Sequence, residues 1–186
     1  HPIVPSNPGV RLDEPTAVIS STGAYDGTGA PEDIYRCFIY ELPTTDAGGI
    51  LTGMDFLPDQ EQIVHHAVGF IVSGADRTAV EAQDAGDENG GWTCFGFSPA
   101  PSAKLVFGWA PGQSATRYDE GTGLRLEQGD FFVMQTHYHY DGTEAPVDQS
   151  QFAVSVVSDD DPAADAMTAL DVQVMLAPAE IPCRAD

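Results

Sequence analysis

The sequence predicts an all-β fold, an antiparallel jelly-roll β-sandwich of about eight strands. Short runs rich in aromatic and β-branched residues recur from Ile34 onward. In several runs every second residue is apolar, as in Phe152, Val154 and Val156, which is the period of a strand with one face on a core. Turn-forming clusters such as DAGG, DENGG and YDGTEAP separate the runs, and this spacing is typical of a sandwich.

The elements follow in order. Residues 1–31 are rich in Pro, Gly, Ser and Thr, which predicts turns and an extended N-terminal arm. Residues 32–178 form the predicted jelly-roll domain, with a short helix near Arg77 to Ala85. Residues 179–186 are expected to be a tail leading to a segment or domain that this chain lacks. The expected strands are residues 34–42, 49–56, 61–72, 104–110, 123–127, 130–140, 151–157 and 170–176.

Composition narrows the possible partners and compartments. The formal net charge of -22 repels nucleic acid and anionic membranes, so neither is an expected partner. No apolar run approaches the roughly 20 residues of a membrane helix. The three cysteines lack C-x-x-C spacing, which argues against a Cys-rich zinc or redox site and predicts one disulfide and one odd thiol. A chain that begins at His1 fits a mature form after signal-peptide removal or an excised fragment.

The histidines carry the main chemical signal. Four of the five lie in two strand-like segments, VHHAV at 64–68 and QTHYHY at 135–140. In a regular strand His137 and His139 point to the same face. The adjacent His65 and His66 would point to opposite faces, so both can bind one metal only if the backbone is bulged or the strand ends there.

Several chemistries fit these residues. Neutral imidazole suits copper and zinc, and three histidines without a thiolate can hold copper that passes single electrons. Alternatively, the histidines are unrelated surface side chains, or they hold zinc with a bound water, although no H-E-x-x-H spacing supports that. A native His1 could chelate copper through its amine and imidazole, as in the histidine-brace oxygenases. The sandwich could also be purely structural or carbohydrate-binding, with Trp92 and Trp109 in its core.

An ordered set of motifs points to one family. It resembles the N-terminal domain of the copper type II, ascorbate-dependent monooxygenases, which include peptidylglycine α-hydroxylating monooxygenase and dopamine β-hydroxylase. The resemblance covers about residues 31–177, most of the chain, and implies a jelly-roll sandwich. The motifs are DIYRCFIYELP at 33–43, VHHAVGF at 64–70, GWTCFGF at 91–97, LVFGWAPG at 105–112, and GLRL followed by VMQTHYHY.

The resemblance implies a ligand set for one copper ion. The family's HH pair and the first histidine of its H-Y segment match His65, His66 and His137. His139 falls outside that metal set and is expected to be a supporting or surface histidine beside it.

The resemblance also implies a disulfide and a compartment. Cys37 and Cys94 match a disulfide of the family, which would place the protein in an oxidising, secreted or periplasmic environment. Cys183 is then left without a partner within the chain and would pair with a C-terminal segment or stay a free thiol.

The implied function is electron transfer within a monooxygenase that hydroxylates C–H bonds. The copper would take an electron from ascorbate or a similar small-molecule reductant. It would relay that electron to an oxygen-activating copper in a C-terminal catalytic domain, the expected partner, so no catalytic residue is expected in this chain. His137 and His139 with Met134 or Met175 could mimic that second site, but the surrounding motifs match the N-terminal domain. The alternative is a stand-alone periplasmic protein that binds or handles copper.

Overall fold

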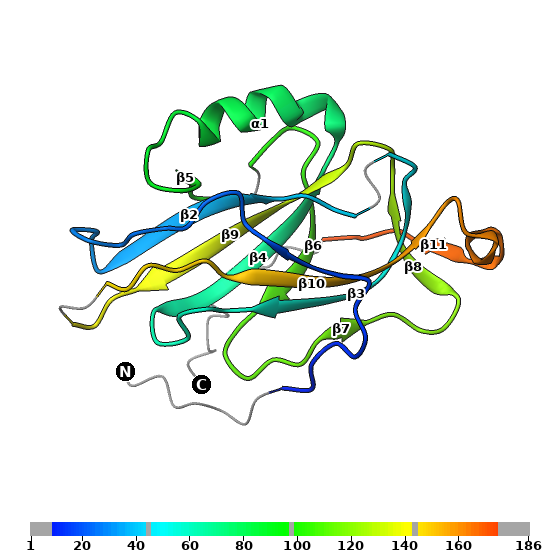
Figure 1. The fold of residues 1–186 in the computed structure, drawn as a ribbon, viewed down its shortest axis with the longest axis horizontal. Helices are drawn as coiled ribbons and strands as arrows, with labels where there is room; N and C mark the ends of the chain where they lie inside the picture. The colour runs from blue at the N-terminus through cyan, green and yellow to red at the C-terminus, as the bar shows by residue number, and fades with distance from the viewer. Residues whose placement is uncertain (1–8, 44–45, 97–98, 143–144, 175–186) are drawn as a thin grey trace, which may run out of the picture.

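Two β-sheets packed face to face build the protein (Figure 1). The structure is a computed structural model that describes residues 9–43, 46–96, 99–142 and 145–174. One sheet has the order β1 (Ala17–Ser20), β10 (Gln151–Ser158), β3 (Gly49–Leu57), β8 (Thr122–Leu126) and β11 (Thr168–Leu170), with β7 (Thr116–Arg117) paired to β3. The other has the order β5 (Trp92–Thr93), β2 (Asp33–Tyr40), β9 (Phe131–His139), β4 (Val64–Val72) and β6 (Lys104–Trp109). The predicted all-β sandwich is confirmed.

The strand order is that of a jelly roll. The chain changes sheets from β2 to β3 to β4, and again from β8 to β9 to β10. Four strands in the order β1-β10-β3-β8 therefore face four in the order β2-β9-β4-β6. This alternation is how a jelly roll closes two antiparallel sheets around one core. Among the strand pairs of the described residues, β11 with β8 is parallel.

Seven of the eight predicted strands match β2, β3, β4, β6, β8, β9 and β10. The prediction of a strand over 170–176 is wrong in its placement, because pairing with β8 ends at Leu170 and residues 171–174 are not in a strand. Val172 still packs against the core between the sheets, whereas Val174 is half exposed. Residues 175 and 176 lie outside the described part of the chain.

The eighth jelly-roll strand is β1, which lies within the segment predicted as an extended arm. It pairs with β10 at the edge of the first sheet, with Ala17 opposite Val154. Ala17 and Ile19 pack against the core between the sheets. Pairing with β10 thus makes a strand of four residues whose own apolar pattern is too short to predict one.

A first hydrophobic cluster fills the space between the sheets, and a second lies on the outer face of the sheet that contains β9. Phe131 and Val133 of β9 and Phe70 of β4 belong to the second cluster. Helix α1 (Arg77–Asp84), preceded by the 3-10 turn η1 (Gly74–Asp76), covers this cluster with Val80. The helix lies where the sequence predicts it. A second 3-10 turn, η2 (Pro162–Ala166), precedes β11.

A disulfide joins Cys37 of β2 to Cys94, just beyond β5. The predicted pair is therefore confirmed. The bridge closes a loop with a sequence separation of 57 residues, which restricts the unfolded chain and so stabilises the fold. Cys183 lies outside the described residues.

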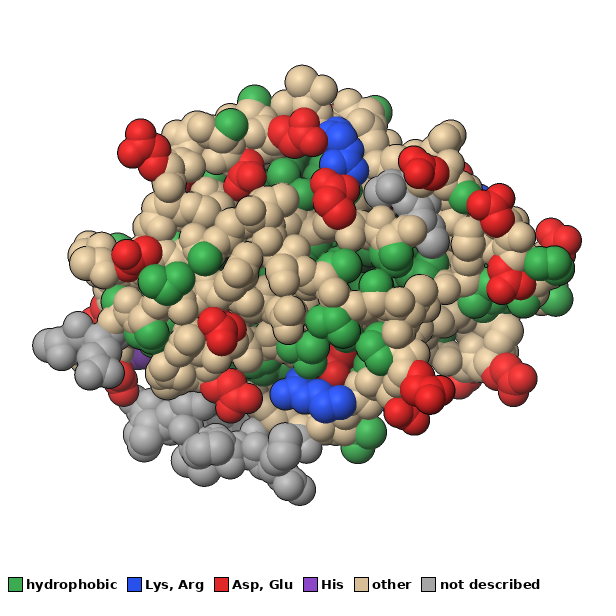
Figure 2. All heavy atoms as spheres, viewed as in Figure 1, with side chains coloured by type: hydrophobic (Ala, Val, Ile, Leu, Met, Phe, Trp, Pro, Cys, Tyr) green, Lys and Arg blue, Asp and Glu red, His purple; other side chains and the backbone are tan. Residues whose placement is uncertain are grey.

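The surface is strongly acidic. Figure 2 shows acidic side chains scattered over the face it displays, with few basic side chains between them. Several arginines are already paired with carboxylates, among them Arg11 with Asp55 and Arg125 with Asp159. No helix in the described part of the chain is long and apolar enough to cross a membrane.

Candidate metal centre

A β-bulge at the start of β4 brings two adjacent histidines to one side of the sheet. Val64 pairs with Tyr138 and His66 pairs with His137, so β4 carries one extra residue, His65, at this point. A bulge places two residues of one strand opposite one residue of its partner and re-aims their side chains. The sequence predicts that His65 and His66 can share a site only through a bulge or a strand end, and the structure has the bulge.

The third histidine comes from β9. Its side chains alternate as predicted: Met134 and Tyr138 lie in the core between the sheets, whereas Phe131 and Val133 lie on the outer face. His137 belongs to the same series as Phe131 and Val133 and therefore shares the outer face. Helix α1 covers the apolar half of that face, and the histidines occupy the other half.

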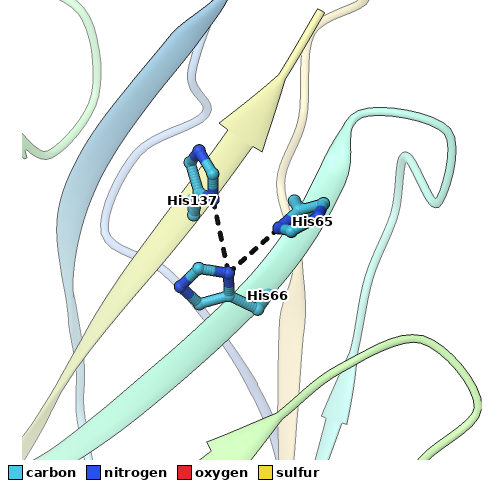
Figure 3. Close-up of side chains that lie close together, drawn as sticks. All are labelled: His65, His66 and His137. Carbon is cyan, nitrogen blue, oxygen red and sulfur yellow. Dashed lines mark hydrogen bonds between the residues drawn. The ribbon is translucent and has the colours of Figure 1, made fainter. Parts of the chain in front are cut away.

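The three imidazoles converge through their Nδ1 atoms (Figure 3). Nδ1 of His66 lies 3.1 Å from Nδ1 of His65 and 3.3 Å from Nδ1 of His137. The ligand atoms of all three lie within 4.8 Å of one another. Two imidazole nitrogens that bind a metal at about 2.0 Å, with an angle of about 100–110° between the bonds, are themselves about 3.1–3.3 Å apart.

Hydrogen bonding alone leaves this arrangement unsatisfied. Each Nδ1 carries either one hydrogen or one lone pair, so Nδ1 of His66 can make a true hydrogen bond to only one of its two neighbours. A cation shared by three lone pairs would satisfy all of them. The donor set therefore fits a metal ion, and no Cys or carboxylate of the described residues belongs to the group.

Burial and charge favour the neutral, metal-binding form of two of the histidines. Burial lowers the pKa of His66, and the neighbouring His137 and His65 lower it further. Burial also lowers the pKa of His137, although the Asp33 carboxylate acts in the opposite direction. Neutral imidazole is the form that binds metals. His65 is exposed, so the site is open to solvent on that side.

Asp33, the first residue of β2, contacts two histidines of β9. Its Oδ1 lies 2.8 Å from Nε2 of His137 and 2.9 Å from Nδ1 of His139. The hydrogen bond from His139, and after it the hydrogen bond from His137, lowers the pKa of the Asp33 carboxyl. His139 therefore lies beside the converging group of three histidines but does not belong to it.

An aromatic pair covers one side of His137. Tyr35 lies opposite His137 in the pairing of β2 with β9, and the two rings stack with centroids 4.2 Å apart and planes 3° apart. Phe95, which is 85% exposed, contacts Tyr35 edge-on, with the ring centroids 5.0 Å apart. Ring contacts thus run from the protein surface to a candidate ligand.

Gln135 lies close to His137 on β9 and contacts the segment that carries the disulfide. It lies two residues before His137 on the same face of β9, and its Nε2 donates to the backbone oxygen of Gly96 over 3.1 Å. The same nitrogen lies 3.6 Å from Sγ of Cys94. The disulfide therefore anchors the segment beside the candidate centre.

Three other residues are candidate ligands in the sequence, and each lies either elsewhere in the fold or outside the described residues. Met134 is fully buried in the core between the sheets, on the opposite face of β9 from His137, so it cannot join His137 and His139 in one site. Met175 and His1 lie outside the described residues.

Sequence reasoning missed Asp33 and Tyr35. Both precede Cys37 at alternate positions of the DIYRC segment, which places all three on one face of a strand. That alternation is the only signal in the sequence, since the pairing of this strand with the QTHYHY strand cannot be read from it.

Comparison with known proteins identifies no relative: no family model matches the chain, and no curated protein matches it.

Proposed function

We propose that this chain is the copper-binding, electron-transfer domain of a mononuclear-copper, ascorbate-dependent monooxygenase. The observation that carries the proposal is the convergence of three Nδ1 atoms, from His65, His66 and His137, on one exposed sheet face. Three imidazoles without a thiolate can hold both Cu(II) and Cu(I). The ordered motifs around these histidines, which resemble that family, supply the choice of copper over zinc.

The protein residues would hold and shape the centre. When bound, copper would supply a one-electron couple between Cu(II) and Cu(I). His66 and His137 are partly or largely buried and held by two neighbouring strands, so their positions change little with the charge between them. Small reorganisation of the ligands favours electron transfer. His65 is exposed and keeps the centre reachable by a small reductant such as ascorbate.

The rest of the assignment belongs to this proposal. The electron would pass to an oxygen-activating copper in a C-terminal catalytic domain or an equivalent partner, where C–H hydroxylation takes place. The Cys37–Cys94 disulfide supports an oxidising compartment, and we propose that the protein is secreted or periplasmic.

One observation favours a second candidate function. Because His65 is exposed and His66 is only partly buried, a bound ion could exchange with a carrier or another site. A stand-alone periplasmic protein that binds or handles copper would use the same ligands without electron transfer to a substrate.

Copper titration of purified, metal-free protein tests the proposal. We expect one Cu(II) per chain, an EPR signal that ascorbate removes, and loss of binding in His137→Ala. His139→Ala is the matched control, because it removes an imidazole from the same strand that lies outside the converging group. Unchanged stoichiometry in His137→Ala would refute the ligand assignment. Copper that binds but resists ascorbate would refute electron transfer and favour copper handling.

A further inference from the structure

Asp33 is positioned to decide which nitrogen of His137 faces the metal. An ionised carboxylate only accepts hydrogen bonds. The 2.8 Å contact therefore requires that Nε2 of His137 carry the hydrogen and donate it to Oδ1 of Asp33. In the neutral ring the lone pair is then on Nδ1, the nitrogen that lies 3.3 Å from Nδ1 of His66.

The same carboxylate oxygen also holds the ring of His139. Nδ1 of His139 lies 2.9 Å from Oδ1 of Asp33 and donates its hydrogen there, which leaves the lone pair on Nε2, and no nitrogen of His139 belongs to the converging group. Asp33 stands opposite His139 in the pairing of β2 with β9. Two histidines with the same side-chain chemistry, two residues apart on one strand, thus become different in role through one carboxylate.

The contact to His137 also has an electronic consequence. A carboxylate that accepts a hydrogen bond from a metal-binding imidazole fixes its ring orientation and increases its basicity. A more basic, anion-supported ligand stabilises the higher charge of Cu(II) more than that of Cu(I). Asp33 would therefore lower the reduction potential of the centre.

We propose that Asp33 is a positioning residue that selects His137 over His139 as the copper ligand and tunes the Cu(II)/Cu(I) potential. This inference rests on the proposed function, because it needs copper at the three histidines. It concerns a residue that touches the ligand and not the metal.

Affinity and potential measurements on copper-loaded Asp33→Asn test the inference. Asparagine keeps the size of the side chain but removes its charge. We expect Cu(II) affinity, measured by competition with a chelator, to fall about 10- to 100-fold. Cu(I) affinity should fall less. A tenfold difference between the two losses raises the potential of a one-electron couple by about 59 mV.

Two variants control the measurement. Glu120→Gln removes one negative charge from an exposed turn before β8 and should leave affinity and potential unchanged. His139→Gln removes the second donor to Asp33 and should keep one copper per chain, with a smaller change in potential than Asp33→Asn. Circular dichroism and thermal unfolding check that each variant is folded.

Several results would overturn the inference. One is a reduction potential in Asp33→Asn that equals that of Glu120→Gln. Another is an equal loss of Cu(II) and Cu(I) affinity in Asp33→Asn, which would indicate that Asp33 has a structural role alone. Loss of copper from His139→Gln would show that His139 is itself a ligand. Wild-type protein that binds no copper would overturn the proposed function and this inference together.

Discussion

At the scale of single residues, Arg36 shows how a buried charge anchors the strand that carries Asp33 and Tyr35. Arg36 is 3% exposed, and its guanidinium lies 2.7 Å from Oδ2 of Asp87. It also donates to the backbone oxygens of three successive residues, 89–91. This one side chain therefore ties β2 to the segment that follows α1, at residues 87–91.

Replacing Arg36 by methionine should destabilise the fold strongly at neutral pH. Buried acceptors would lose their donor, which costs about 3–5 kcal/mol for a buried ion pair broken on one side. The pKa of the Asp87 carboxyl is lowered, mainly by its hydrogen bond with Arg36. A carboxyl whose pKa is lower in the folded than in the unfolded protein stabilises the fold at pH values above its unfolded pKa. This contribution of Asp87 is lost as the pH falls through its folded pKa, so the difference in stability between wild type and Arg36→Met should shrink in acid.

Urea unfolding at neutral and acidic pH measures this effect. Arg125→Met is the matched control, since Arg125 is 39% exposed and pairs with carboxylates on the surface, where ion pairs contribute little. Equal losses for the two variants, or a loss for Arg36→Met that does not shrink in acid, would contradict the account.

The candidate site shows how far single residues can be predicted. The sequence indicates the face shared by His137 and His139 and the bulge that His65 and His66 require. It gives no sign that Asp33 would contact His137, because that contact depends on the register between two strands whose contacting residues are 104 positions apart in the chain. An alternating pattern predicts which face of a strand a residue lies on. It does not predict which residue of the neighbouring strand lies opposite, because that depends on how the two strands pair.

At the scale of elements, strands with several alternating apolar residues are predictable and short ones are not. β3, β4 and β9 each span nine residues, and their patterns are clear in the sequence. β5 and β7 span two residues each and are formed by pairing with a longer neighbour. The same holds for β1, whose place beside β10 completes the jelly roll.

The outer face of β9 also divides into two parts for a physical reason. Toward Phe131, apolar side chains are covered by α1 and shielded from water. Toward His137, α1 does not cover this face, and polar side chains replace apolar ones from Gln135 onward. The change from apolar to polar residues along one face of β9 is therefore visible in the sequence, but the helix that explains it is placed only by the fold.

At the scale of the whole molecule, the net charge should govern how fast an anionic reductant reaches the proposed copper ion. The net charge of -22 gives the surface a strongly negative potential. Ascorbate is an anion at neutral pH, so repulsion slows its approach. Added salt screens charges beyond a Debye length of about 10 Å at 0.1 M. We expect the rate of Cu(II) reduction by ascorbate to rise as salt is added.

Stopped-flow measurement of the Cu(II) signal follows this reaction across a range of salt concentrations. A neutral hydroquinone is the control, and its rate should change little. If the rate with ascorbate falls as salt is added, an attractive local field at the site outweighs the net charge, and this prediction is wrong.

We propose that His65, His66 and His137 together hold one copper ion. X-ray absorption spectroscopy of the copper-loaded protein tests it most directly, because it counts imidazole rings and detects sulfur around the metal. We expect three imidazole nitrogens at about 2.0 Å and no sulfur, with the same spectrum in His139→Gln and the loss of one imidazole in His137→Ala. Fewer than three imidazoles in the wild type, a sulfur ligand, or an unchanged spectrum in His137→Ala would contradict it.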